Sequence, residues 1–278
     1  MTDPLIADPA NRAQPPAATV PLLVESAGAT LLGVLHRPGG PGPHPVVVLL
    51  HGFPGYERNF DLAHALSRAG YATLVFHYRG SWGTAGQWSW RHALEDTAEV
   101  VAALRNPRTA AEHRLDPTQL ALVGHSFGGF VALTTAATDP SISAVASIAG
   151  FDLGSAGAGI RADPGQRVGY LENWVVELLP LAGTSAEALV EEMAGVPDDW
   201  RLPARAPRFA GRPVLLIGGS QDTAAPIADH HQPLVDAYTA AQLEQHVWPT
   251  DHGLADHRVA LARTVIDYLS RALKGADG

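Results

Sequence analysis

The stretch "QLALVGHSFGGF", residues 119–130, decides the fold because an apolar strand-like run ends in it and a helix-like run begins. At the junction, the pentapeptide GHSFG (residues 124–128) flanks Ser126 with a glycine two positions before it and two after it. On a sharp strand-to-helix turn these two positions come close together and must lack side chains. Such a turn exposes the serine hydroxyl and points the free N–H groups of the helix start at any oxygen that gains negative charge. The spacing predicts a nucleophilic Ser126, with an ordinary turn of small residues as the alternative.

Around this stretch, apolar runs of strand length alternate with amphipathic helical stretches. Five runs are continuously hydrophobic, as strands buried on both faces require. They are "PVVVLLHG" (45–52), "YATLVFHY" (71–78), "QLALVGHS" (119–126), "ISAVASIAG" (142–150) and "RPVLLIGGS" (212–220). "QLEQHVWP" (242–249) predicts a further strand, and residues 254–273 predict a closing helix. This alternation specifies an α/β fold in which helices cover both faces of a mainly parallel central sheet.

Three segments depart from the alternation. Residues 1–19 contain prolines and little periodicity, so we expect an extended N-terminal arm before a single domain of residues 20–278. "VPLLVES" and "ATLLGVLHRP", separated by a turn-like Ala-Gly pair, predict two edge strands. Residues 151–211 are too long for a simple connection and contain the helix-like "YLENWVVELLP" and "SAEALVEEMAG". They predict a small helical lid insertion, with a surface excursion without function as the alternative.

Composition restricts the possible partners. The chain of 278 residues has 28 acidic and 19 basic side chains, a net charge of −9 and no run of lysine or arginine. This argues against nucleic acid and anionic membranes and favours a small neutral or apolar substrate. No apolar run approaches the ~20 residues of a membrane-spanning helix, and the N-terminus does not have the pattern of a secretory signal, so we expect a cytoplasmic enzyme. The absence of cysteine excludes disulfides, thiolate metal sites and a cysteine nucleophile.

The loop "HGFPG", residues 51–55, adds a resemblance to a known family. It resembles the oxyanion loop of the α/β-hydrolase superfamily, and GHSFG resembles the nucleophile elbow of that family. The likeness covers nearly all of the chain after about residue 20 and implies the α/β-hydrolase fold. By position, it also implies that the backbone N–H groups of Phe53 and Phe127 form the oxyanion hole.

A second loop, "YRGSWGTAGQWSW" (78–90), resembles the Arg-Gly-containing loop of the serine aminopeptidase-like and dienelactone-hydrolase-like branches of this family. Dienelactone hydrolases themselves carry a cysteine nucleophile, which this chain lacks. We expect Arg79 to be structural, and Trp82, Trp88 and Trp90 to pack the loop rather than line a pocket.

A serine hydroxyl needs a base, usually histidine, that is oriented by a carboxylate. The chain order of the family is serine, then acid, then histidine. Asp222 follows a buried run and two glycines, which is where the acid is expected. Asp152 also follows a strand but precedes the insertion, and Asp198 and Asp199 lie within the insertion, so we prefer Asp222.

Five histidines follow Asp222 in the chain and are candidates for the base. They are His230, His231, His246, His252 and His257. Only His252 lies in a short loop at the carboxyl end of a predicted parallel strand, from which a side chain can reach Ser126. We expect a solvated helix face rather than a metal site at residues 230–231, a strand at residue 246 and an exposed helical position at residue 257. His252 is therefore the predicted base, and Asp251 is expected to help cap the closing helix.

Ser126, His252, Asp222 and two backbone donors would make an acyl-transfer site that needs no cofactor and no metal. We expect an ester rather than an amide substrate, because no separate propeller-sized N-terminal domain is present and Phe53 and Phe127 suggest an apolar site. The predicted function is a carboxylic ester hydrolase for small to medium acyl esters. The alternatives are a serine aminopeptidase or acyl-peptide hydrolase and, from another class, a catalytically silent ligand-binding protein.

Two further points concern the substrate. A haloalkane dehalogenase is disfavoured, because the elbow carries serine where that enzyme has an aspartate nucleophile. In the insertion, Tyr170, Trp174 and Leu178 are the residues expected to line the pocket. The oligomeric state does not follow from the sequence.

Overall fold

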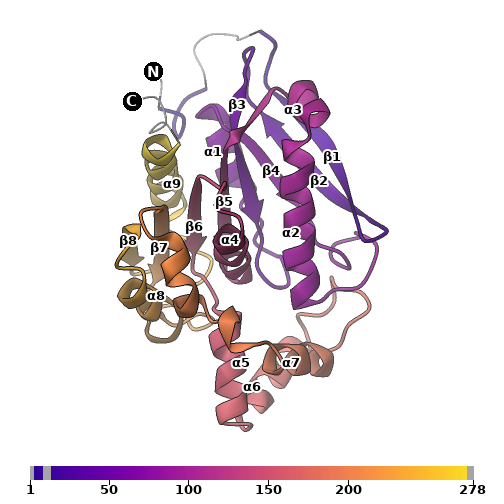
Figure 1. The fold of residues 1–278 in the computed structure, drawn as a ribbon, viewed down its shortest axis with the longest axis vertical. Coiled ribbons are helices and arrows are strands. Elements are labelled where there is room, and N and C mark those ends of the chain that lie inside the picture. Colours follow the sequence, from indigo (N-terminus) through magenta and orange to yellow (C-terminus); the bar gives the residue numbers. More distant parts are fainter. Residues whose placement is uncertain (1–2, 9–13, 274–278) are drawn as a thin grey trace.

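The computed structural model describes residues 3–8 and 14–273 and contains one eight-stranded sheet (Figure 1). The strand order is β1-β2-β4-β3-β5-β6-β7-β8. The strands are β1 (Ala18–Ser26), β2 (Ala29–Arg37), β3 (His44–Leu50), β4 (Ala72–Phe76), β5 (Leu115–His125), β6 (Ala144–Ile148), β7 (Pro213–Gly219) and β8 (Gln242–Trp248). β1 and β2 pair antiparallel, as do β2 and β4, and every later pair is parallel.

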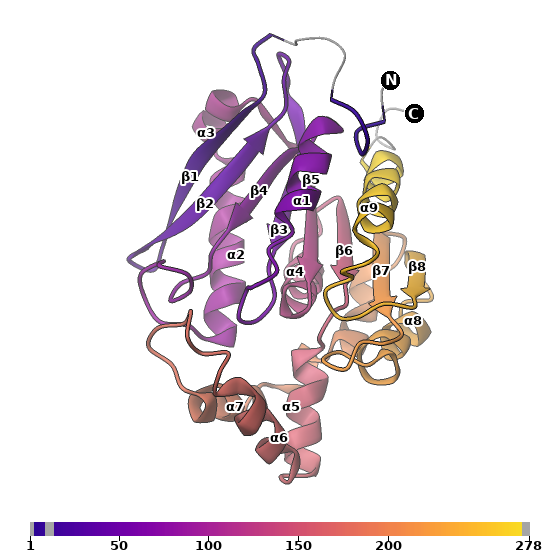
Figure 2. The same cartoon turned by 180° about the vertical axis from the view of Figure 1, so that it is seen from behind.

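Helices cover both faces of this sheet. The helices are α1 (Phe60–Arg68), α2 (Trp90–Arg105), α3 (Pro107–His113), α4 (Phe127–Thr138), α5 (Leu153–Ala162), α6 (Gln166–Trp174), α7 (Ala186–Ala194), α8 (Gln232–Ala237) and α9 (Arg258–Ala272). Figure 1 is seen from the face covered by α2 and α4, and Figure 2 from the face covered by α1 and α9. The prediction of a mainly parallel sheet with helices on both faces is confirmed.

Strand β3 shows why these runs are continuously hydrophobic. Val46, Val48 and Leu50 belong to the apolar cluster that includes α2 and α4, whereas Val47 and Leu49 belong to the cluster that includes α1 and α9. Because successive side chains of a strand point to opposite faces, both sets must be apolar when both faces are covered.

The first two strands form a hairpin at the edge of the sheet. Ala27 and Gly28 connect them with positive φ angles of 46° and 80°, the backbone of a tight two-residue hairpin turn. β1 begins at Ala18, inside the segment expected to be an extended arm. Residues 1–2 and 9–13 of that expected arm lie outside the described residues.

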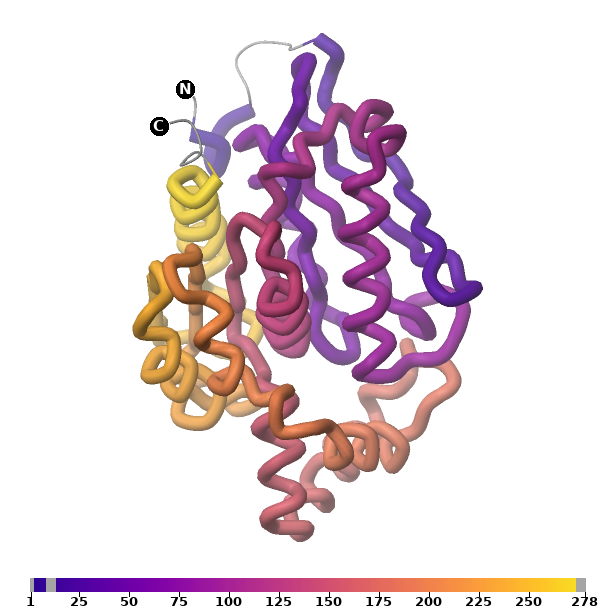
Figure 3. The backbone as a smooth tube through the Cα atoms, in the orientation of Figure 1, coloured from indigo at the N-terminus to yellow at the C-terminus, as the bar shows by residue number. Residues whose placement is uncertain are grey.

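Residues 151–211, called the cap below, run from β6 through α5, α6 and α7 and return to β7 (Figure 3). Two short 3-10 helices, η1 (Asp198–Trp200) and η2 (Leu202–Phe209), complete the return. In Figures 1 and 2 the cap lies beyond the carboxyl ends of the parallel strands. The helix expected at 170–180 ends early, because α6 stops at Trp174 and turns follow.

The cap is tied to the body of the molecule at the start of α2. The Trp90 indole N–H donates to the carbonyl of Leu189, with a nitrogen–oxygen distance of 2.9 Å. The Glu192 carboxylate accepts the backbone N–H groups of Trp90 and Arg91 at 3.1 and 2.9 Å. A carboxylate at a helix N-terminus satisfies N–H groups that have no partner within the helix.

The closing helix begins later than predicted. It starts at Arg258 rather than at Leu254, because the φ angle of Leu254 is +54° and a right-handed helix cannot pass through that residue. Asp251 therefore does not cap α9, and its carboxylate accepts the N–H of Ala255 in the preceding turn. In the described ranges, no helix combines the length and the apolar character that crossing a membrane requires.

Candidate active site

Ser126 occupies the junction between β5 and α4 in a backbone conformation that side chains seldom adopt. Its φ and ψ angles are 56° and −125°. Three backbone hydrogen bonds hold the turn: the Ser126 N–H donates to Ile148 at 2.9 Å, and the Ser126 carbonyl accepts from Gly129 and Phe151 at 2.9 and 3.0 Å. Strain of this kind persists only where the surrounding structure enforces it, and it is typical of functional positions.

Glycines around Ser126 are required by close approaches. A Cβ atom on Gly124 would lie 1.9 Å from the Gly128 carbonyl oxygen, and one on Gly128 would lie 2.0 Å from the Leu50 carbonyl oxygen. A Cβ atom on Gly52 would lie 2.7 Å from Cβ of Ser126. The two glycines of the pentapeptide therefore meet as expected, and the loop after β3 lies directly against the serine.

Asp222 and His252, which come from the loops after β7 and β8, form a hydrogen-bonded pair. His252 Nδ1 lies 2.7 Å from Asp222 Oδ2, and the other carboxylate oxygen accepts the N–H groups of Ala224 and Ala225 at 2.8 Å each. Burial alone would raise the pKa of Asp222. The hydrogen bond and charge of His252, together with the two backbone N–H groups, outweigh it and lower this pKa below 3.8.

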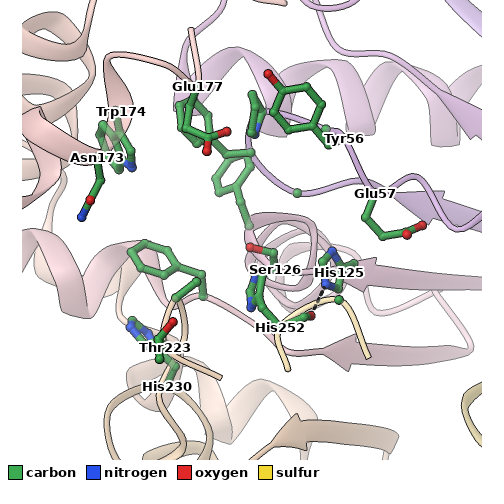
Figure 4. Close-up of a pocket in the computed structure, with 18 of the residues that line it drawn as sticks. Tyr56, Glu57, His125, Ser126, Asn173, Trp174, Glu177, Thr223, His230 and His252 are labelled. Atoms are coloured by element: carbon green, nitrogen blue, oxygen red, sulfur yellow. Dashed lines mark hydrogen bonds between the residues drawn. The ribbon is translucent and has the colours of Figure 1, made fainter. Parts of the chain in front are cut away.

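The ionised carboxylate fixes the orientation of the histidine. Because a carboxylate only accepts hydrogen bonds, Nδ1 of His252 is the protonated nitrogen, and Nε2 is left as an acceptor. The backbone carbonyl of His252 accepts a hydrogen bond from Nε2 of the buried His125, at 2.8 Å (Figure 4). This bond ties the loop after β8 to the residue that precedes Ser126.

Ser126 and His252 line the same cavity, as Figure 4 shows. Within residues 3–8 and 14–273, no hydrogen bond joins the Ser126 hydroxyl to His252. In sites without substrate, catalytic hydrogen bonds are often long and shorten in the substrate complex. The geometry thus brings Ser126, His252 and Asp222 to one place, and their catalytic roles stay predictions.

Phe53 and Phe127, the predicted oxyanion donors, also line the cavity. Among the described residues, neither backbone N–H has a hydrogen-bond acceptor. Phe127 is the first residue of α4, where a helix supplies no acceptor for its own N–H groups. Both N–H groups are therefore free to bind an oxygen on a ligand.

The cavity has a volume of about 870 Å³, which is within the usual range for small-molecule sites. The cap forms part of its wall through aromatic, apolar, amide and acidic side chains. They are Phe151, Tyr170, Asn173, Trp174, Val176 and Glu177. Tyr170 and Trp174 line the cavity as expected, whereas Leu178 is not among its lining residues.

The expectation that the tryptophans of the 78–90 loop pack rather than line a pocket is confirmed for Trp88 and wrong for Trp90. Trp90 lines the cavity while its ring packs against Phe53 and Trp174, with ring centroids 5.0 and 5.4 Å apart. Trp88 is buried in the core and does not line the cavity. Arg79 is buried and contacts the carboxylates of Asp96 and Glu95 at 2.6 and 2.5 Å, so its structural role is confirmed.

The charges around the cavity are all acidic. Glu57, Glu177 and Asp229 contribute carboxylates, and no lysine or arginine lines the cavity in the part of the chain that the structure describes. Arg258 lies 3.9 Å from the Glu57 carboxylate, so among the described residues Glu177 and Asp229 supply the unpaired charge. Negative charge of this kind repels an anionic ligand and tolerates a neutral one.

Sequence reasoning misplaced the pair of histidines after Asp222. His230 and His231 are buried rather than solvent-facing, in a short π-helical turn, η3 (Ile227–His231). The turn packs onto Gly218, where a Cβ atom would meet Ile227 at 2.4 Å. His230 lines the cavity and His231 does not. No local pattern marks these positions, because their burial depends on tertiary contacts, such as the stacking of His230 on Phe151.

Two of the other candidates, Asp152 and His257, have structural partners. Asp152 accepts N–H groups of Ser155 and Leu202 at 3.1 and 3.2 Å and caps α5. His257 precedes α9 and stacks on Trp248, with 5.7 Å between ring centroids. Across the described ranges, no group of three or more histidine, aspartate or glutamate side chains is arranged to hold a metal ion.

Comparisons with known proteins agree with this architecture. The family model described as alpha/beta hydrolase fold matches residues 45–212, more than half of the chain. The quorum-quenching protein AidA of Acinetobacter baumannii is 32% identical over 138 residues, which are 48% of this chain and 44% of that protein. The 2,6-dihydropseudooxynicotine hydrolase of Paenarthrobacter nicotinovorans is 29% identical over 138 residues, 49% of this chain and 36% of that enzyme. The chain thus spans less than half the length of these curated relatives.

Among solved structures, an esterase of Pyrococcus furiosus superposes with a TM-score of 0.69 at 17% identity, covering 92% of each chain. At this level of identity, the similarity establishes the fold and leaves activity to the site itself.

Proposed function

Because the chain belongs to the α/β-hydrolase fold family, we propose that it hydrolyses small to medium carboxylic esters, with Ser126 as the nucleophile, His252 as the base and Asp222 as the orienting acid. One observation carries the proposal. The 2.7 Å contact between His252 and Asp222 leaves Nε2 of His252 as an acceptor in the cavity that Ser126 enters on its strained turn. A serine hydroxyl is a weak nucleophile until such a base accepts its proton.

The proposed reaction proceeds in two halves. Nε2 of His252 takes the proton of the Ser126 hydroxyl as the serine oxygen attacks the ester carbonyl, and the protonated imidazole then gives that proton to the departing alkoxide. In the second half, His252 activates a water molecule that attacks the acyl-serine and releases the acid. Asp222, whose pKa is held below its ordinary value, stays ionised and stabilises the imidazolium in both halves.

The free backbone N–H groups of Phe53 and Phe127 are the proposed oxyanion hole. Both belong to segments that lie against Ser126, the loop after β3 and the start of α4. Donors that are already in place stabilise the charge on the carbonyl oxygen without reorganising, and losing one such donor typically costs about 3 kcal/mol of transition-state stabilisation.

The walls of the cavity support an ester over a charged substrate. Phe53, Phe127, Trp90 and Trp174 provide an apolar surface beside Ser126. Assignment to the dienelactone-hydrolase-like or serine aminopeptidase-like branch of the family rests on the 78–90 loop and is part of the same proposal.

Covalent labelling with a fluorophosphonate tests the nucleophile. The wild type should be labelled, and Ser126→Ala should not be, while its circular dichroism and melting temperature stay close to those of the wild type. A wild type that is not labelled and hydrolyses no ester would overturn the enzyme proposal in favour of a ligand-binding protein.

The substrate class is tested by assaying p-nitrophenyl acyl esters beside aminoacyl-p-nitroanilides. We expect turnover of the esters. Turnover of the anilides alone would replace the esterase by an aminopeptidase while leaving the assignment of Ser126 intact.

A further inference from the structure

His230 is a buried cavity residue that the proposed mechanism does not use. Only 8% of its surface is exposed, and its ring stacks on Phe151 with 4.5 Å between ring centroids. It lies in η3, shortly after Asp222, and lines the cavity together with Ser126 and His252 (Figure 4). The ring therefore has a fixed position beside the reacting groups.

The hydrogen bond on one side of the ring determines which nitrogen carries the proton. The backbone N–H of Asp152 donates to Nδ1 of His230 at 3.0 Å. A backbone N–H can only donate, so Nδ1 is the unprotonated nitrogen and Nε2 carries the hydrogen. Burial lowers the pKa of His230 to about 4, against the opposing effect of the Asp229 carboxylate, so the ring is neutral at pH 7.

The Nε2–H group has no acceptor within residues 3–8 and 14–273. It is also not among the polar atoms that are sealed off without a partner, so it keeps access to the cavity that the ring lines. Polar groups in protein interiors are nearly always paired. A donor that is fixed, neutral and unpaired at the wall of a cavity is suited to bind an acceptor on a ligand.

We propose that His230 is a specificity residue, whose Nε2–H donates a hydrogen bond to a neutral oxygen of the substrate, such as an ether, keto or hydroxyl oxygen. This inference rests on the proposed ester hydrolysis. The acceptor is neutral because Asp229 and Glu177 place negative charge at the cavity wall with no ion-pair partner among the described residues, whereas Arg258 lies 3.9 Å from the Glu57 carboxylate. The favoured substrates are then esters that carry a second oxygen beyond the scissile group.

Matched pairs of esters separate the effect of this hydrogen bond on kcat/KM from the effects of substrate size and shape. In the acyl series, p-nitrophenyl methoxyacetate, 3-methoxypropanoate and 4-methoxybutanoate are each compared with the unbranched ester in which a CH₂ group replaces the ether oxygen. In the alcohol series, 2-methoxyethyl butanoate is compared with butyl butanoate. The quantity measured is the ratio of kcat/KM for the two members of each pair.

Two variants test the roles of the two ring nitrogens separately. His230→Asn keeps an acceptor near the position of Nδ1 for the Asp152 N–H but has no atom at the position of Nε2. His230→Gln can place an N–H donor near the position of Nε2 but offers Asp152 no acceptor. The matched control is His231→Asn, which alters the neighbouring buried histidine that does not line the cavity.

For at least one pair, we expect the preference of the wild type for the oxygen-containing ester to fall about tenfold in His230→Asn, the equivalent of one hydrogen bond. His230→Gln should retain most of the preference, and His231→Asn should retain all of it. Equal ratios in the wild type and His230→Asn for every pair would overturn the inference while ester hydrolysis stands. If the wild type hydrolyses no ester and Ser126 takes no label, the proposed function fails, and this inference fails with it.

Discussion

The cavity has a floor, residues 50–55 and 124–130, and a cap, residues 151–211. The two differ in how tightly their segments pack. In the floor, Cβ atoms on Gly124 and Gly128 would come within 2.0 Å of neighbouring carbonyl oxygens, so the segments are in direct contact. The cap leaves large apolar side chains in solvent, and Leu179 and Val176 are 87% and 67% exposed. The floor therefore fixes the position of Ser126, whereas the cap can change its surface without changing the fold.

This difference separates chemistry from selectivity. Acyl transfer needs a nucleophile, a base and oxyanion donors held to within fractions of an ångström, and the contacts of the floor provide this. Within the cap, α5 and α7 pack into the hydrophobic core through residues such as Leu153 and Met193, whereas α6 has no buried residue. Elements with few buried contacts open at lower free energy and commonly carry substrate selectivity.

The largest effect is expected from adding one methyl group to the floor. In Gly128→Ala, the new Cβ would lie 2.0 Å from the carbonyl oxygen of Leu50, so β3 and α4 must separate. We expect unfolding to become easier by more than about 3 kcal/mol, seen as a large drop in melting temperature. Gly169→Ala in α6 of the cap meets nothing within 4 Å and should change stability by less than about 1 kcal/mol. If the two substitutions lowered the melting temperature equally, the proposed difference in packing between floor and cap would be wrong.

The same contrast explains what could be predicted from the sequence. The roles of Gly124 and Gly128 were predictable because a tight turn depends on local sterics, which glycine spacing reports directly. The strands were predictable because burial on both faces requires unbroken apolar runs. His230 was not predictable, since its burial and its free N–H depend on Phe151 and the Asp152 backbone, which lie about 80 residues earlier in the chain. The early end of α6 likewise depends on how the cap packs, which no local pattern reports.

The second largest effect concerns the carboxylate that orients His252. In Asp222→Asn, the amide favours the wrong tautomer of His252, and kcat for ester hydrolysis should fall by about 10³–10⁴-fold. Asp251→Asn is the matched control, because this aspartate precedes His252 but bonds Ala255 instead, and its kcat should stay within about threefold of the wild type. A larger loss in Asp251→Asn than in Asp222→Asn would reverse the assignment of the acid.

Lowering the pH should reduce the stability of the floor more than that of the cap, because residues 151–211 contain no histidine. In the floor, burial and the neighbouring His252 lower the pKa of His125 to about 4, against 6.5 in an unfolded chain. Below pH 6.5 the unfolded chain therefore binds the proton first, and stability that is fully present above pH 6.5 is lost as the pH falls toward 4. Each such histidine should contribute about 2 kcal/mol of lost stability between pH 7 and pH 5.

This pH dependence is measurable by urea unfolding at pH 7 and pH 5, with hydrogen exchange to locate the weakened segments. His51, whose pKa burial lowers to about 3, should add to the loss. An unfolding free energy that stays constant between pH 7 and pH 5 would show that these histidines are hydrated enough to titrate normally in the folded chain.

The smallest effect is expected in the cap, at a residue that faces the cavity. Trp174 packs on Phe53 and Trp90, with ring centroids 5.1 and 5.4 Å apart, so Trp174→Ala should enlarge the cavity and lower kcat/KM for long acyl esters by about tenfold. Most of this loss should appear in KM, since Ser126 and His252 keep their supports in the floor. Leu179→Ala, at the exposed surface of the same cap, should alter neither kcat/KM nor the melting temperature. A loss in kcat alone for Trp174→Ala would mean that the cap helps position the reacting groups, and the division between floor and cap would have to be redrawn.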